Sequence, residues 1–174
     1  MKYSDKHVML LKFLNELPRK MLLLADHDHA PAFVLHDFCS ESYFNLSKAA
    51  YFVDNPDFDC TKGIAGVCKH EESFCTIPDI WQERERYCSI LDCSPFYKKV
   101  RDFNRPSVSK NCNEKECVDI IAHEFDFTEP RYITWPMKHN NHGIFVFQAH
   151  DGDQELIDEH LEHGVYYLNF CPLG

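Results

Sequence analysis

Helix-like and strand-like patterns both occur along this chain of 174 residues, and they do not follow one another in a regular order. Repeated strand–helix units are typical of folds with a parallel sheet, whereas an irregular mixture favours an α+β architecture. We therefore predict a single α+β domain over residues 1–174. Its expected core is a mixed, largely antiparallel sheet packed with four to five helices.

The first third of the chain predicts one helix followed by short strands. Ser4 is a suitable cap for a helix over residues 5–17, and Pro18 is expected to end it. The apolar face of this helix is expected to contain Val8, Leu11 and Leu14, with Met9 and Phe13 beside them. Four short apolar runs are expected to form strands: 21–25, 32–38, 49–53 and 63–67.

Helix-capping signals mark the middle of the chain. Ser94-Pro95 predicts a helix over residues 95–103, because proline is favoured at the first helical position. Asn113 and Glu116 have the spacing of a capping box, which predicts a helix over residues 114–124. Thr76 and Asp79 suggest a further helix over residues 77–92.

The last third predicts strands at 131–135 and 144–149, a helix at 154–163 and a final strand at 165–170. Gly164 is expected to end that helix in a left-handed conformation. The last strand–helix–strand segment suits a right-handed parallel crossover.

Charge and hydropathy narrow the class of partner. The formal net charge is −10, which disfavours a nucleic acid or an anionic membrane as the main partner. No apolar run approaches the roughly 18 residues that suggest a spanning helix. We therefore expect a cytoplasmic protein, in which thiols are kept reduced. A small molecule, another protein and a second copy of the chain all stay open as partners.

Nine cysteines and 11 histidines are the most unusual feature of the composition. Four of the cysteines and two of the histidines lie between residues 36 and 75, largely on segments that we expect to be loops between strands. Thiolate and imidazole are preferred zinc ligands, so this segment predicts a zinc site that is either structural or catalytic. The candidate metal ligands are His36, Cys39, Cys60, Cys68, His70 and Cys75.

Other interpretations of these cysteines stay open. The tight spacing of known zinc and iron–sulfur motifs is absent, and an iron–sulfur cluster on four of the cysteines ranks below zinc. Cys60 and Cys68 are candidates for a disulfide in an oxidising compartment. Free cysteines also pack as small apolar residues, as we expect for Cys88, Cys93, Cys117 and Cys171.

Histidines outside that segment give weaker hypotheses. The run 26–29 alternates aspartate and histidine, and His139, His142 and His150 follow near the end of the chain. Each of these groups is also typical of polar turns. We interpret His160 and His163 as groups that stabilise the end of a helix.

Three hypotheses of function follow from the sequence. The first is a metal-binding protein, and the second is a non-catalytic interaction module or dimer with packed thiols. The third is a thiol enzyme that uses Cys39 as its nucleophile, which requires a nearby imidazole or cation to lower the pKa of the thiol. In a strand, His36 and Cys39 would lie on opposite faces, so the imidazole would have to come from elsewhere.

Overall fold

The computed structural model describes residues 5–24, 27–72, 74, 76–150 and 154–173. In this part of the chain the strands form one antiparallel sheet in the order β3-β2-β1-β5-β4. The α+β prediction is confirmed, and the sheet is antiparallel throughout. The strands are β1 (Leu46–Asn55), β2 (Cys60–Cys68), β3 (Asn104–Arg105), β4 (Arg131–Pro136) and β5 (His142–Ala149).

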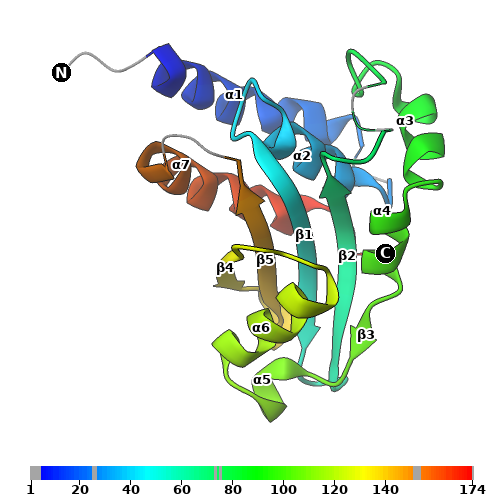
Figure 1. Cartoon of the computed structure of the whole chain (residues 1–174), viewed down its shortest axis with the longest axis vertical. Coiled ribbons are helices and arrows are strands. Elements are labelled where there is room, and N and C mark those ends of the chain that lie inside the picture. The colour runs from blue at the N-terminus through cyan, green and yellow to red at the C-terminus, as the bar shows by residue number, and fades with distance from the viewer. Residues whose placement is uncertain (1–4, 25–26, 73, 75, 151–153, 174) are drawn as a thin grey trace.

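Helices cover both faces of the sheet (Figure 1). The α-helices are α1 (Asp5–Leu22), α2 (Ala30–Cys39), α3 (Arg84–Leu91), α4 (Pro95–Arg101), α5 (Val108–Asn111), α6 (Glu114–Glu124) and α7 (Gln154–Val165). Two short 3-10 helices are η1 (Lys138–Asn140) and η2 (Tyr166–Phe170). Residues of α1, α2 and α7 pack on one face of the sheet, and residues of α4 and α6 pack on the other.

The central strand β1 supplies apolar side chains to both layers. Successive residues of a strand point to opposite faces, so Tyr51 packs with the α1 and α2 layer while Phe52 packs with the α4 and α6 layer. A strand that is buried on both faces has no polar alternation. This explains why residues 49–53 form a continuous apolar run.

Two glycines allow α4 to lie close to β2. A Cβ at Gly63 would stand 1.8 Å from the carbonyl oxygen of Val100, and one at Gly66 would stand 2.6 Å from the Val100 side chain. Any larger residue at Gly63 would therefore push the helix away from the strand. This contact fixes the position of the segment that leads from α4 to β3.

Several predicted elements are confirmed. The capping box of Asn113 and Glu116 is present, and α6 spans the predicted residues. Ser94 caps α4 by accepting a hydrogen bond from the Tyr97 amide. The strands expected at 49–53, 63–67, 131–135 and 144–149 correspond to β1, β2, β4 and β5, and the first two are longer than predicted.

The strands predicted at 21–25 and 32–38 are wrong, because the described residues of both segments include helix and no strand. The helix α1 continues through Pro18 to Leu22, since Leu17 and Met21 bury their side chains on the same side as the preceding turns. The second segment is α2, with Pro31 in its first turn. A helix that is buried on nearly every side is apolar all round, and a short apolar run does not distinguish it from a buried strand.

Two other predictions about helices and strands are wrong near residues 77–92 and 165–170. Only residues 84–91 of the first segment form an α-helix. The second is the 3-10 helix η2, so the predicted parallel crossover does not occur. Gly164 does not end α7 and lies inside it, where a Cβ would stand 3.2 Å from the Phe38 ring. Its small size serves the packing of α7 on α2.

No helix in the described ranges is long and apolar enough to cross a membrane.

Candidate functional site

The structure separates the predicted metal ligands instead of gathering all of them. Cys60 and Cys68 are the first and last residues of β2, where they pair with Asn55 and Lys48 of β1. Eight residue steps along a strand place their Cα atoms about 27 Å apart. They cannot ligate one ion or form a disulfide with each other in this fold.

Three of the predicted residues do lie near one another. His36 and Cys39 are three residues apart on α2, which places them on one side of the helix, and the structure brings Cys68 to the same place. The expectation that His36 and Cys39 point apart is wrong because the segment is a helix. We name this group, with the neighbouring rings of Phe74 and Tyr87, the His36 corner.

The imidazole of His36 is held between two rings. It stacks on Phe74 with 4.4 Å between centroids and meets Tyr87 edge-on at 5.1 Å. Its Nε2 lies 3.3 Å from the Phe74 carbonyl oxygen, to which it donates, so Nδ1 is the unprotonated nitrogen. Nδ1 is buried and has no hydrogen-bond partner. Burial lowers the pKa of His36, which favours the neutral ring.

The thiol of Cys39 lies deep in the core. Its side chain is fully buried, and burial raises the pKa of the thiol far above its ordinary value. A nucleophilic cysteine needs the opposite shift and access to a substrate. This environment therefore weighs against Cys39 as a nucleophile.

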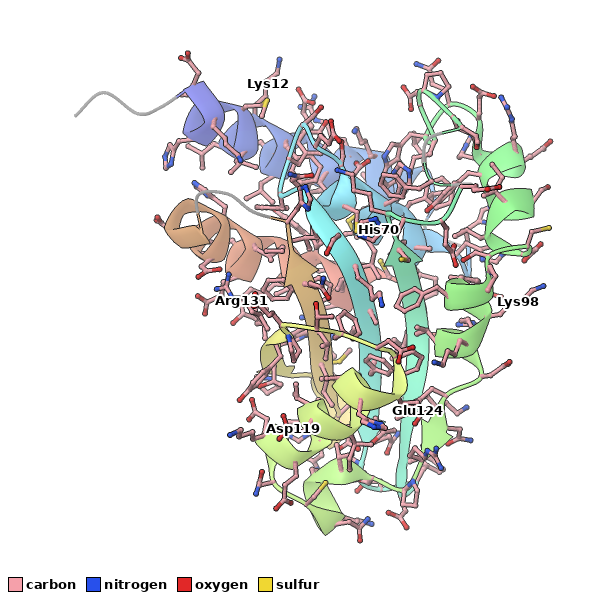
Figure 2. The ribbon with its side chains drawn as sticks, viewed as in Figure 1. Lys12, His70, Lys98, Asp119, Glu124 and Arg131 are labelled. Atoms are coloured by element: carbon pink, nitrogen blue, oxygen red, sulfur yellow. The ribbon has the colours of Figure 1, made fainter. Side chains whose placement is uncertain are left out.

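The remaining predicted ligands add nothing to this group within the described part of the chain. His70 is exposed beyond the end of β2, as Figure 2 shows, and Cys75 lies outside the described residues. Among the residues that the structure describes, no three histidine, cysteine, aspartate or glutamate side chains are placed to hold a metal ion.

The other histidine groups are also dispersed. Of the 26–29 run, Asp26 lies outside the described residues, while Nδ1 of His29 is 2.8 Å from the Tyr97 hydroxyl. His142 and His150 stand at opposite ends of β5. His160 is buried and its Nε2 lies 2.9 Å from Nδ1 of His7, which joins α7 to α1.

A different feature, the outer face of α1, presents apolar side chains to solvent. Val8, Leu11 and Leu22 are exposed, and Leu22 retains 76% of its accessible surface. With Asn15 and Pro18 they follow the alternating three- and four-residue spacing of one helix face. We name these five residues the α1 outer stripe. A separate face of α1 is buried through Leu10, Phe13, Leu14, Leu17 and Met21.

The α1 outer stripe continues into η2. Pro18, Met21 and Leu22 of α1 line a groove of about 360 Å³ together with Tyr167 and Phe170. Phe170 retains 77% of its accessible surface. Large side chains that gather in one exposed apolar patch are typical of interaction sites, whereas single exposed apolar residues are ordinary.

Basic side chains flank the α1 outer stripe. Lys12 and Arg19 are seven residues apart and lie along one side of it, and Figure 2 shows Lys12 projecting away from the sheet. Glu16 lies 4.0 Å from Lys12, in an exposed pair that contributes little to stability. The helix carries four basic and two acidic side chains, although the whole chain has a net charge of −10.

The sequence contained a signal for this surface. Val8 and Leu11 were assigned to the buried face with Leu14, but they lie on the other side of the helix from Leu10 and Leu17. Two apolar stripes on one helix indicate two contacts.

Comparison with known proteins gives no relative for this chain, because no family profile, curated protein or solved structure matches it.

Proposed function

We propose that this chain is a non-catalytic interaction module that binds an amphipathic helix of a partner protein along the α1 outer stripe. The observation that carries the proposal is the row of exposed apolar side chains on the α1 outer stripe, interrupted by Asn15, which leads into the groove that Leu22 shares with Phe170. Helix-in-groove recognition uses anchors with this spacing. Packed thiols suit the same proposal, since burial raises the pKa of both Cys117 and Cys171 to about 12.

Charge selects the kind of partner. In an antiparallel pair of α1 helices, Lys12 and Arg19 would face Arg19 and Lys12 of the second copy, and such like-charge contacts oppose association. The partner helix that fits carries acidic side chains beside its apolar seam. An anionic membrane fits less well, because the net charge of −10 repels it at long range.

The test uses two synthetic heptad peptides with leucine at the seam, one with glutamate and one with lysine at the flanking positions. Fluorescence anisotropy should show that the glutamate peptide binds and the lysine peptide does not. Leu22→Glu and Phe170→Glu should each weaken binding about tenfold or more. Ile120→Glu is the matched control, because Ile120 is half exposed on α6, which packs on the other face of the sheet.

Three outcomes would overturn this proposal. Equal binding of both peptides would show that charge plays no part. A dimer in sedimentation that Leu22→Glu dissociates would assign the surface to a second copy of the chain. Binding to anionic vesicles that Lys12→Glu abolishes would assign it to a membrane.

A second candidate function is zinc binding in the His36 corner. A metal-bound histidine commonly donates its other ring N–H to a carbonyl, and His36 makes that bond while its buried Nδ1 has no partner. His36 and Cys68 line a common cavity of about 20 Å³. This candidate ranks second because no third donor stands with them closely enough to hold an ion among the described residues.

Elemental analysis of protein purified without a histidine tag tests the zinc candidate. We expect stoichiometric zinc that is lost from Cys68→Ser. Cys60→Ser should keep the metal, because Cys60 lies at the far end of the same strand. Metal-free protein, or equal loss in the control variant, would contradict this candidate.

A further inference from the structure

A cavity lined by both polar and apolar side chains lies away from both the α1 outer stripe and the His36 corner. It has a volume of about 240 Å³, and its walls come from the end of β1, from α5 and α6, and from β4 and β5. We name it the Asp54 pocket. Its polar lining residues include Asp54, Cys112, Glu114, Cys117, Thr134 and His142.

Asp54 gives the pocket a fixed negative charge. Thr61 and Ser107 donate hydroxyl hydrogen bonds to its carboxylate at 2.6 and 3.2 Å, and the amides of Val108 and Ser109 donate at 3.0 and 3.4 Å. Burial alone would raise the pKa of Asp54, but these bonds outweigh it and hold the pKa below its ordinary value. Asp54 therefore stays ionised at neutral pH.

Glu114 adds a second carboxylate at the first turn of α6. Thr134 donates a hydrogen bond of 2.7 Å to its Oε1, which orients the group beside the pocket. The described lining of the pocket contains the two carboxylates and no lysine or arginine, and His142 is its one basic side chain. The pocket therefore attracts cations and repels anions.

The thiols of Cys112 and Cys117 add polarisable, uncharged surface to the lining of the Asp54 pocket. Cys112 precedes the Asn113 cap and Cys117 follows it in the first turns of α6, the two positions whose side chains meet in a hydrophobic staple. Burial raises the pKa of both, and raises that of Cys117 to about 12. Val108, Val118 and Ile144 complete the lining with apolar surface.

We propose that the Asp54 pocket binds a small organic ammonium compound. The ammonium group is placed by Glu114 and Thr134 in the field of Asp54, and the apolar part of the ligand contacts the valines, Ile144 and the neutral thiols. Ligand pockets typically combine an apolar lining with a few polar groups that fix orientation, and this one has that composition. The pocket is separate from the proposed partner surface, so the two proposals can fail independently.

The experiment is a titration of the whole chain, followed by amide chemical shifts, with butylammonium chloride against sodium butyrate at equal ionic strength. We expect saturable shifts with butylammonium at Ser109, Cys112 and Val118 and none with butyrate. Glu114→Gln and Thr134→Val should weaken binding, the first by about tenfold because a bond to a charged group is lost. Asp119→Asn, on the same helix but outside the pocket, is the matched control (Figure 2).

Several results would overturn this proposal. If butylammonium gave no saturable shifts, the pocket would not be a binding site for it. Equal shifts from butyrate would show that the cavity binds apolar chains without regard to charge. An equal effect of Asp119→Asn would show that the net charge of the chain is responsible. Micromolar displacement of butylammonium by Zn²⁺ that is lost in Cys112→Ser and Cys117→Ser would reassign the pocket to a metal.

Discussion

The last turn of α2, residues 36–39, and the Asp54 pocket use the same kinds of side chain with opposite electrostatic results. On α2, burial lowers the pKa of His36, raises that of Asp37 to about 6 and raises that of Cys39. Each group is driven towards its neutral form. In the pocket, Asp54 is held ionised although it is also buried.

Hydrogen-bond donors account for the difference between the two carboxylates. Asp37 accepts a bond of 2.9 Å from Trp81 Nε1 and a long contact of 3.5 Å from Lys20. Asp54 accepts from two hydroxyls and two backbone amides. Burial disfavours a charge, and only a nearly complete set of donors compensates for it.

Replacing each carboxylate by its amide should have the largest effect on stability. Asp54→Asn should lower the free energy of unfolding by about 2–4 kcal/mol, because its new N–H groups face donors that then have no acceptor. Asp37→Asn keeps an acceptor for Trp81 and should change stability by less than about 1 kcal/mol. Urea unfolding at pH 7 measures both, and equal losses would contradict our account.

The thiols of the two regions should also respond differently to substitution by serine. Cys39→Ser should cost about 1–3 kcal/mol, because a hydroxyl would replace a packed thiol in a fully buried place. Cys112→Ser should cost less than about 0.5 kcal/mol, since Cys112 is partly exposed beside a cavity. Thermal and urea unfolding of the two variants measure these losses of stability. A larger loss for Cys112→Ser than for Cys39→Ser would contradict the conclusion that Cys39 is enclosed in the core and Cys112 borders an open cavity.

The pH dependence of stability should differ in sign for the two carboxylates. The pKa of Asp37 is raised from 3.8 to about 6 in the folded chain, so folding binds a proton between these values. Its contribution to stability is therefore lost as pH rises from about 4 to about 6. The pKa of Asp54 is lowered, so its contribution is lost as pH falls below the ordinary range of an aspartate.

Difference curves between wild type and each variant isolate these contributions from the histidines. Subtracting the Asp37→Asn curve from the wild-type curve should leave a falling slope between pH 4 and 6. The same subtraction for Asp54→Asn should leave a rising slope at lower pH. If both difference curves had slopes of the same sign, burial alone would determine the direction of the pKa shift of both carboxylates.

Local sequence signals predicted the local structure well. Asn113 with Glu116 and Ser94 with Pro95 mark helix starts that the structure confirms, because a cap bonds to amides only two or three residues away. The strands predicted at 131–135 and 144–149 are present as β4 and β5 with slightly longer bounds. Residues 32–38 were assigned wrongly, since a fully buried helix and a fully buried strand share one apolar composition.

The candidate sites depended on contacts that are distant in sequence. His36 and Cys68 meet only because α2 packs on the end of β2, and Asp54 meets Ser107 only because the segment after α4 returns to β1. Residue type alone placed Cys60 with Cys68 and placed Cys117 among the packed thiols. The fold places Cys60 and Cys68 at opposite ends of β2 and opens a cavity beside Cys117.

Composition and short-range bonds were enough to predict the fold class, the helix caps of α4 and α6, and an acidic chain rich in thiols and imidazoles. Which thiols are enclosed, which carboxylate stays charged and which face of α1 stays exposed depends on how the helices and strands pack together. The physical reason is that solvation and hydrogen-bond satisfaction depend on every neighbour in space, and most of those neighbours are far away along the chain.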